Sequence, residues 1–314
     1  MRYYLGVDGG GTKTEALVAD QNGVIIGVGK SGSSNPHFIG KNMALSALLD
    51  AVSAALSGIN MMDVAKAVIC IPGMKKYKSE LAERTGIDKS KLFTYADEQN
   101  TFVGALGKGY GVVVLAGTGS FAIGVNKNGS SDIVGGWGPV IGDPGSGYWM
   151  AVRALQAVAR EYDGLAEHTV LTDKIKNHYS IGSINALKGV VSIDNISPVA
   201  VLVKEAALEG DEAAKDIVWE AGVELAKMAS AVITRLELDH KDYSLALTGG
   251  ISNFGELIMR PFINALRKNH RNIDIVEPLF APVVGAVMLA MKEDGISWNE
   301  DILNNLKVSY GKVG

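Results

Sequence analysis

The sequence predicts an α/β protein built from two related halves, and three observations support this prediction. The chain has 314 residues, which suggests about two domains at roughly 150 residues per domain. Short apolar runs typical of buried strands alternate with stretches of helical periodicity. A glycine-threonine pattern near the N-terminus recurs 106 residues later, which indicates a repeated structural unit.

The first half is expected to begin with three strands and a helix. The strands are Tyr3–Val7, Glu15–Ala19 and Val24–Val28. An Asn22-Gly23 dipeptide, a strong hairpin signal, joins the last two strands. Leucine and valine residues at helical spacing then predict a helix that ends near Gly58. Two strands and a helix complete this half: Ala67–Ile71, Leu92–Tyr95 and Thr101–Leu106.

The second half begins in the same way. Gly11 aligns with Gly117, and the same offset carries Asn22-Gly23 onto Asn128-Gly129 without a gap. In this register the counterpart of Asp8 is Val114. The later elements are expected to be helices Trp149–Tyr162 and Ala213–Leu236, strand Ser244–Leu247, helix Phe254–Leu266, strand Ile273–Val276 and helix Val283–Met291.

The repeat also predicts the domain organisation. We expect an N-terminal domain over residues 1–110 and a C-terminal domain over residues 111–314. Two related halves that face each other predict a cleft lined by their turns. One alternative is left open, in which the final helices pack back on the N-terminal domain.

Composition excludes several classes of protein. A net charge of −4 gives no positive surface for nucleic acid. The single cysteine, Cys70, cannot form an internal disulfide, so a reducing cytoplasm is the expected location. The N-terminus reaches Asp8 before a signal-peptide core could form. The longest stretch without charged residues, Gly109–Asn126, is interrupted by glycines, so we expect strands there and no membrane span.

Glycine is in excess, at 38 of 314 residues or about 12% against an ordinary 7%. Three glycine turns each follow a predicted strand: Asp8–Thr14, Ala116–Ser120 and Thr248–Asn253. Consecutive backbone N–H groups in such turns suit phosphate oxygens, whereas a single turn could equally be a simple hairpin. Three turns in matched halves favour a nucleotide site. The candidate nucleotide-binding residues are Gly10, Gly11, Thr12, Lys13, Thr118, Gly119, Gly249, Gly250 and Ser252.

Two carboxylates are candidates for the chemistry. Asp8 ends the first strand directly before the glycine run, where it could hold Mg²⁺ through water or only cap the turn. Asp97 follows the strand Leu92–Tyr95, where it could act as a general base or serve only as a helix N-cap. Lys13 could approach the phosphates, and a solvated hairpin lysine is the alternative.

The three glycine turns resemble the two phosphate motifs and the adenosine motif of the actin/Hsp70/sugar-kinase superfamily. Val283–Ala286 resembles the second connecting helix of that superfamily. The run Gly135–Gly138, followed by Gly142–Gly147, resembles the N-acetylglucosamine kinase-like group. That group also contains the ATPases that activate benzoyl-CoA and 2-hydroxyacyl-CoA reductases. The resemblance covers nearly the whole chain and implies two ribonuclease H-like (actin-like ATPase) domains with a central cleft.

The resemblance also implies roles for individual residues. Asp97 falls on the family's catalytic aspartate, although Ala96 replaces the usual preceding asparagine and Glu98 adjoins it. The implied sugar-binding residues are Asn35, Asp97, Gly136, Trp137 and Asp143. Read without the resemblance, Trp137 is more often a core residue, and the sequence around Asn35 is an ordinary turn.

The resulting expectation is an ATP- and Mg²⁺-dependent kinase of a sugar hydroxyl, most simply N-acetylglucosamine or a related hexose. A sugar acid such as 2-keto-3-deoxygluconate is an open alternative, because the phosphate machinery would be the same. A different class is an activator ATPase that drives a partner reductase, but its relatives use more than one cysteine per chain to hold an iron–sulfur cluster. The expected partner is a small sugar, and a homodimer is the expected assembly.

Overall fold

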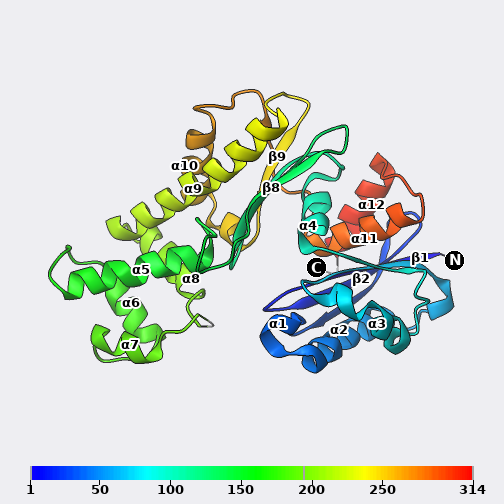
Figure 1. The fold of residues 1–314 in the computed structure, drawn as a ribbon, viewed down its shortest axis with the longest axis horizontal. Helices are drawn as coiled ribbons and strands as arrows, with labels where there is room; N and C mark the ends of the chain where they lie inside the picture. Colours follow the sequence, from blue (N-terminus) through cyan, green and yellow to red (C-terminus); the bar gives the residue numbers. More distant parts are fainter. Residues whose placement is uncertain (1, 194, 313–314) are drawn as a thin grey trace. The chain divides into compact units, whose positions relative to one another are not determined.

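The computed structural model describes residues 2–193 and 195–312. It divides into two compact units, which we call unit 1 (Met1–Gly109 with Glu277–Gly314) and unit 2 (Tyr110–Val276). Each unit contains a five-stranded sheet covered by helices (Figure 1). This confirms the predicted two-domain α/β fold, whereas the cleft between the halves stays a prediction. Within the described residues, no helix is both long enough and apolar enough to cross a membrane.

The sheet of unit 1 contains all five strands expected in the first half. They are β1 (Tyr3–Gly9), β2 (Thr14–Asp20), β3 (Ile25–Ser31), β4 (Val64–Cys70) and β5 (Leu92–Tyr95). The spatial order is β3-β2-β1-β4-β5. The first three strands pair antiparallel, as the hairpin signal predicts, while β1, β4 and β5 are parallel. The carboxyl ends of β1, β4 and β5 therefore meet at one edge of the sheet.

Helices cover both faces of this sheet. They are α1 (Pro36–Ile39), α2 (Lys41–Ala55), α3 (Lys78–Thr85), α4 (Asp97–Leu106), α11 (Pro282–Glu293) and α12 (Glu300–Tyr310), with short 3-10 segments η1 (Met61–Asp63) and η2 (Met74–Tyr77). Helices α2 and α3 pack on one face, and α4 and α11 pack on the other (Figure 1). A Cβ at Gly6 of β1 would collide with the Val287 backbone of α11. Glycine thus lets the late helix lie directly on the first strand.

Unit 2 repeats the sheet of unit 1. Its strands are β6 (Gly111–Ala116), β7 (Ser120–Val125), β8 (Ser131–Gly135), β9 (Ser244–Thr248) and β10 (Asp274–Ile275). Their order, β8-β7-β6-β9-β10, matches that of unit 1, with antiparallel and parallel pairs in corresponding places. Only two residues of the expected strand Ile273–Val276 pair with β9.

The repeat is real, but its register before the first turn differs by one residue from the sequence alignment. Ala16 pairs with Val7, and its counterpart Ala122 pairs with Val114. The structural counterpart of Asp8 is therefore Leu115, and the expected match to Val114 is wrong. The cause is the turn, which has four residues between Gly9 and Thr14 but three between Ala116 and Ser120. With either alignment, the residue that corresponds to Asp8 in the second half is not a carboxylate.

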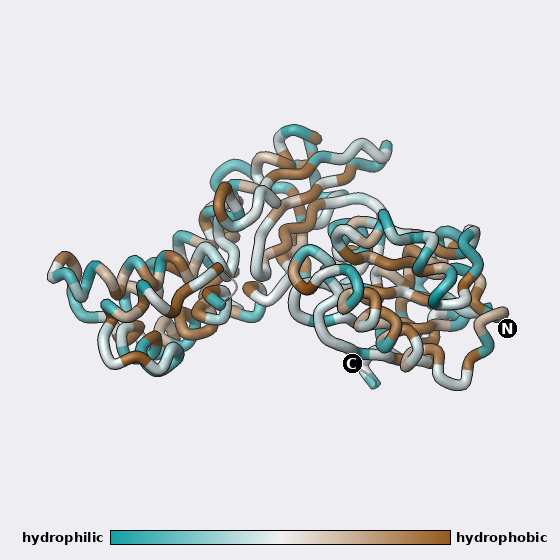
Figure 2. Tube along the Cα trace, turned by 60° about the horizontal axis from the view of Figure 1, so that its bottom comes forward, coloured by the Kyte–Doolittle hydropathy of each residue, from teal (hydrophilic) through white to brown (hydrophobic). Residues whose placement is uncertain are grey.

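Six helices complete the described part of unit 2: α5 (Gly147–Tyr162), α6 (Leu171–His178), α7 (Leu187–Val190), α8 (Val199–Leu208), α9 (Glu212–Leu236) and α10 (Glu256–Leu266), with the short 3-10 segments η3 (Ile184–Ala186) and η4 (Gly250–Phe254). The buried side chains of α5, α8 and α9 form one core with the strands. Hydrophobic stretches accordingly follow the strands and inner helices (Figure 2). The expected helix Phe254–Leu266 begins two residues later, because Gly255, at φ +60°, separates η4 from α10.

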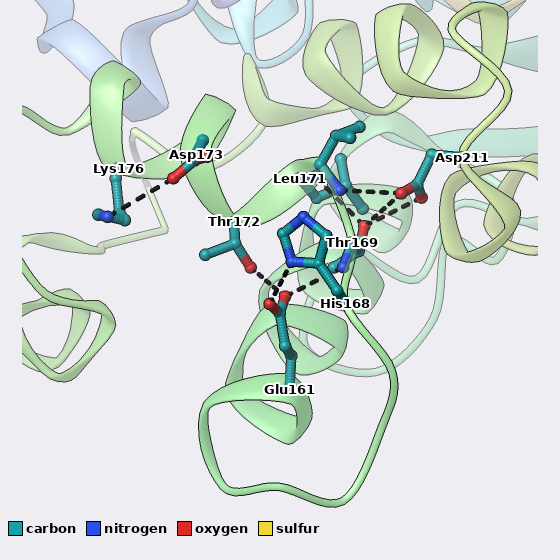
Figure 3. Close-up of polar contacts among 9 residues, drawn as sticks. Glu161, His168, Thr169, Leu171, Thr172, Asp173, Lys176 and Asp211 are labelled. Atoms are coloured by element: carbon teal, nitrogen blue, oxygen red, sulfur yellow. Dashed lines mark hydrogen bonds and ion pairs between the residues drawn. The ribbon is translucent and has the colours of Figure 1, made fainter.

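Two carboxylates hold the ends of α5, α6 and α9 together (Figure 3). Glu161 in α5 accepts hydrogen bonds from the Thr172 hydroxyl and from the Thr169 N–H, the latter at 3.2 Å. Asp211 accepts from the Thr169 hydroxyl at 2.9 Å and caps α9 by accepting from the Ala214 N–H at 2.8 Å. These bonds fix a helical insertion that unit 1 lacks between its third and fourth strands.

Candidate active site

The carboxyl edge of the unit 1 sheet gathers the two candidate carboxylates. Asp8 lies opposite Cys70 in β4, and Cys70 lies opposite Tyr95 in β5. Asp97 follows Tyr95 by two residues and begins α4. Ligands of α/β sheets bind at such carboxyl edges, because the loops that leave parallel strands all emerge there.

Asp8 is partly exposed and held by one strong hydrogen bond. The Asn100 side chain donates to Asp8 Oδ1 from 2.7 Å. Burial raises the pKa of Asp8 to about 6, although the bond from Asn100 opposes the rise. The negative charges of Asp97 and Glu15 add to it. Like-charge repulsion of this kind makes the edge a favourable place for a cation.

Asp97 is the first residue of α4, and the N-cap is Ala96, which makes no side-chain capping bond. The alternative that Asp97 serves only as the N-cap is therefore wrong. Burial raises the pKa of Asp97, and it raises the pKa of its hydrogen-bonded neighbour Glu98 as well. A carboxylate with a raised pKa is a better proton acceptor than an ordinary one, which suits general base chemistry.

The first glycine turn is tight and exposed. The Gly10 N–H donates to the Lys13 carbonyl at 3.0 Å, which leaves Gly11 and Thr12 at the tip. Lys13 Nζ lies 2.8 Å from Glu15 Oε2, and this hydrogen bond raises the lysine pKa. Lys13 is thus a charged hairpin lysine that already has a carboxylate partner. Its role toward phosphate stays a prediction.

The second glycine turn packs against the start of α5. The Gly147 N–H donates to the Gly117 carbonyl at 2.7 Å, and the Tyr148 N–H donates to the Thr118 carbonyl at 3.3 Å. Ser146 caps this helix by accepting from the Trp149 N–H at 3.1 Å. These contacts fix the backbone around the turn before any ligand binds.

The third glycine turn lies beside the second. Gly249 has φ +98°, and a Cβ there would collide with the Ala116 carbonyl. Gly250 has open space around it, and the Ser252 hydroxyl donates to the Gly249 carbonyl at 2.7 Å. The turn leads into the 3-10 segment η4, and the α-helix α10 begins only at Glu256.

The glycine-rich loop after β8 also reaches the second turn. Asp143 is 6% exposed, has φ +55° and accepts from the Gly138 N–H at 3.1 Å. A Cβ at Gly119 would lie 2.6 Å from Asp143 Oδ2. Burial raises the Asp143 pKa, and backbone N–H groups of the loop oppose the rise. Unit 2 therefore brings the second turn, the third turn and Asp143 together.

Trp137 and Gly136 lie in the same loop, where Gly136 has φ +72°. The Trp137 side chain is 71% exposed, so the alternative that it is a core residue is wrong. In unit 1, Asn35 is buried and caps α1 by accepting from the His37 N–H at 2.9 Å. The adjacent Ser34 N–H donates to the Gly10 carbonyl at 3.2 Å, which places Asn35 near the first glycine turn.

A magnesium ion is implied by the fold family, and the donor set of unit 1 is consistent with it. Within the described residues, no group of three or more His, Cys, Asp or Glu side chains could enclose a metal. Magnesium often keeps several waters and takes only one or two carboxylates, together with substrate phosphates. A single partly exposed carboxylate beside a glycine turn, Asp8, fits that mode of binding.

Asn100 is a site residue that the sequence reasoning missed. It lies directly before the expected helix Thr101–Leu106, and nothing near it in the sequence indicates contact with a residue 92 positions earlier. The only available signal was its spacing, three residues after Asp97 on one helical face.

Comparison with known proteins identifies the family. The family model described as the BadF/BadG/BcrA/BcrD ATPase family matches residues 5–290. The chain belongs to this family. It is 28% identical to an N-acetylmuramic acid/N-acetylglucosamine kinase of Clostridium acetobutylicum over 307 residues, covering 93% of this chain and 99% of the relative. It is 27% identical to an N-acetyl-D-glucosamine kinase of Dictyostelium discoideum, with 92% and 97% covered.

Solved structures give the same result. A candidate N-acetylglucosamine kinase from Chromobacterium violaceum superposes with a TM-score of 0.74 at 26% identity, over 92% of this chain and 99% of that one. A ROK family glucokinase from Streptomyces griseus has the same fold, with a TM-score of 0.61 at 21% identity and the same coverage. The resemblance drawn from the glycine motifs is confirmed. So is the enzyme class, an ATP-dependent carbohydrate kinase.

Proposed function

We propose that this protein transfers the γ-phosphoryl group of ATP to a hydroxyl of an amino sugar, with N-acetylglucosamine as the first candidate. The observation that carries the proposal is the carboxyl edge of unit 1, which holds Asp8 beside a phosphate-type turn and Asp97 at the start of α4. The names of the two full-length relatives favour an amino sugar over another hexose.

In this proposal Asp97 accepts the proton of the acceptor hydroxyl as that oxygen bonds to phosphorus. Its raised pKa supports the role. In this proposal the glycine turns bind ATP through Gly10, Gly11, Thr12, Lys13, Thr118, Gly119, Gly249, Gly250 and Ser252. The N–H groups of Gly10 and Ser252 are bonded within their own turns, so these two residues shape the turns rather than donate those N–H groups to phosphate. Alignment and charge stabilisation supply most of the remaining rate enhancement in phosphoryl transfer.

Asp8 is the residue that would hold Mg²⁺, through a water molecule. The ion, when bound, would neutralise charge on the phosphates. Asp8 Oδ1 is engaged by Asn100, and Oδ2 accepts no hydrogen bond from the other described residues, which leaves it for this contact.

For the sugar we propose Asn35, Asp97, Gly136, Trp137 and Asp143. The exposed indole of Trp137 supports an apolar contact with a sugar ring. Asp143 is held by backbone N–H groups, so its carboxylate is oriented in advance of binding. A homodimer and a cytoplasmic location remain predictions.

The decisive experiment is to measure ADP release by the purified protein with a panel of sugars. The panel contains N-acetylglucosamine, glucosamine, N-acetylmuramic acid, glucose and 2-keto-3-deoxygluconate. We expect turnover to depend on an amino sugar. Turnover only with 2-keto-3-deoxygluconate would show that the substrate is a sugar acid and not an amino sugar. Rapid ATP hydrolysis that does not depend on any sugar would favour an activator ATPase. That class is disfavoured by the single cysteine, Cys70, which is buried at the end of β4.

The role of Asp97 is tested by Asp97→Asn. We expect sugar-dependent turnover to fall by about 10²–10⁴-fold, the usual contribution of general base catalysis, with nucleotide binding retained. The matched control is Gln99→Ala, an exposed position two residues further along α4. Wild-type activity in Asp97→Asn would refute the assignment.

A further inference from the structure

Asn100 is an unusual residue for the middle of a buried helix face. It is the fourth residue of α4 and is 0% exposed. Its Nδ2 donates to Asp8 Oδ1 at 2.7 Å and to the Pro282 carbonyl of α11 at 3.1 Å. Its Oδ1 is buried and has no hydrogen-bond partner among the described residues.

This arrangement is unfavourable for stability taken alone. A buried acceptor without a partner loses its hydration and gains nothing in return. Such groups are rare in folded proteins, and each calls for a specific reason. An apolar residue of similar size would avoid the unpaired oxygen, so the reason lies in what Nδ2 does.

The packing of α4 against α11 leaves the Asn100 side chain little freedom. A Cβ at Gly285 in α11 would collide with the Asn100 carbonyl, and a Cβ at Gly104 would lie 3.0 Å from the Ala281 carbonyl. The two helices therefore touch backbone to backbone. The amide is held from both sides, by Asp8 and by Pro282, and so it fixes the position of Asp8 Oδ1.

We propose that Asn100 is a positioning residue for Asp8. It orients the carboxylate so that Oδ2 is presented to the hydrated magnesium of bound nucleotide. It also ties this carboxylate to the helix that begins with Asp97. The inference rests on the proposed nucleotide role of Asp8, and it adds a residue that acts through Asp8 rather than on substrate.

The test measures Mn²⁺ binding to the protein–ADP complex by electron paramagnetic resonance, with Mn²⁺ in place of Mg²⁺. Two variants remove the donor: Asn100→Ala, and Asn100→Leu, which keeps the volume if the smaller residue fails to fold. We expect about tenfold weaker Mn²⁺ binding in each, as for other residues that orient a metal-binding carboxylate. The KM for sugar should stay unchanged, and Gln99→Ala should bind Mn²⁺ like the wild type.

A double-mutant cycle with Asp8→Ala separates positioning from general structural support. If Asn100 acts through Asp8, changing Asn100 in the Asp8→Ala background has no further effect on Mn²⁺ binding. An equal loss in both backgrounds would overturn the proposal, and so would wild-type Mn²⁺ affinity in both Asn100 variants.

The metal-binding readout is independent of the acceptor substrate. If the sugar panel fails with wild-type protein, the proposed function fails, while the coupling between Asn100 and Asp8 is still measured in the ADP complex.

Discussion

Replacing Asp8 with Asn should stabilise the folded protein while it impairs nucleotide-metal binding. The folded environment raises the pKa of Asp8 from its ordinary 3.8 to about 6. At 1.36 kcal/mol per pKa unit, this is about 3 kcal/mol of unfavourable free energy for the charged form at neutral pH. Because Asp8 is partly exposed to solvent, we expect a gain of about 1–3 kcal/mol in the Asp8→Asn variant. The new side chain can still accept the bond from Asn100.

The pH dependence follows from the sign of the shift. Well below pH 3.8 the carboxyl group is protonated in both states and makes no difference to stability. As pH rises, the unfolded chain loses this proton first, so the wild type loses stability between about pH 4 and pH 6. Above pH 6 the loss is complete. The Asp8→Asn variant has no such group, so its advantage grows over that interval and then stays constant.

The measurement is urea-induced unfolding of both proteins between pH 4 and pH 8, without magnesium or nucleotide. Subtracting the free energy of unfolding of one protein from that of the other removes, to first order, the contribution from titration of Asp97 and Glu98. A variant less stable than the wild type at pH 7 would refute the reasoning. A difference that does not change between pH 4 and pH 7 would also refute it.

Two further predictions concern stability, one for each unit. Gly285→Ala should destabilise the protein by about 1–3 kcal/mol, because the added Cβ meets the backbone of α4. The control is Gly189→Ala in α7, where the added Cβ has open space and the change should be neutral or slightly stabilising. The urea midpoint of Gly285→Ala should therefore fall, and that of Gly189→Ala should stay unchanged or rise. Ser146→Ala should cost about 1 kcal/mol by removing the cap of α5, and an unchanged midpoint would contradict this.

The sequence predicted most of the strands because their signals are local. Apolar runs bounded by turn residues located β1 to β9 to within a few residues, and the repeated Asn-Gly turn located both hairpins. The short helices α6, of eight residues, and α8, of ten residues, were not predicted. For β10 the sequence predicted a strand that is too long. Apolar character predicted a strand of four residues there, but pairing with β9 ends after two.

The site residues could be predicted only where they lie in or beside a recognisable sequence motif. Asp8 and Asp97 were found from their positions at strand ends, and the structure brings these strands to one edge. The one-residue error at Val114 arose because a gap-free alignment cannot show that the second turn is shorter. Asn100 was missed because its partners, Asp8 and Pro282, are 92 and 182 residues away in the chain.

The division of the chain between the units has a consequence for biosynthesis. Unit 2 is continuous in sequence, whereas unit 1 is completed by residues that follow it. Helix α11 lies directly on β1, yet the ribosome must make all of unit 2 between α4 and α11. At roughly 5–20 residues per second this delay is on the order of ten seconds. During that time the face of β1 that α11 will cover is open, so this nascent segment is the one most in need of a chaperone.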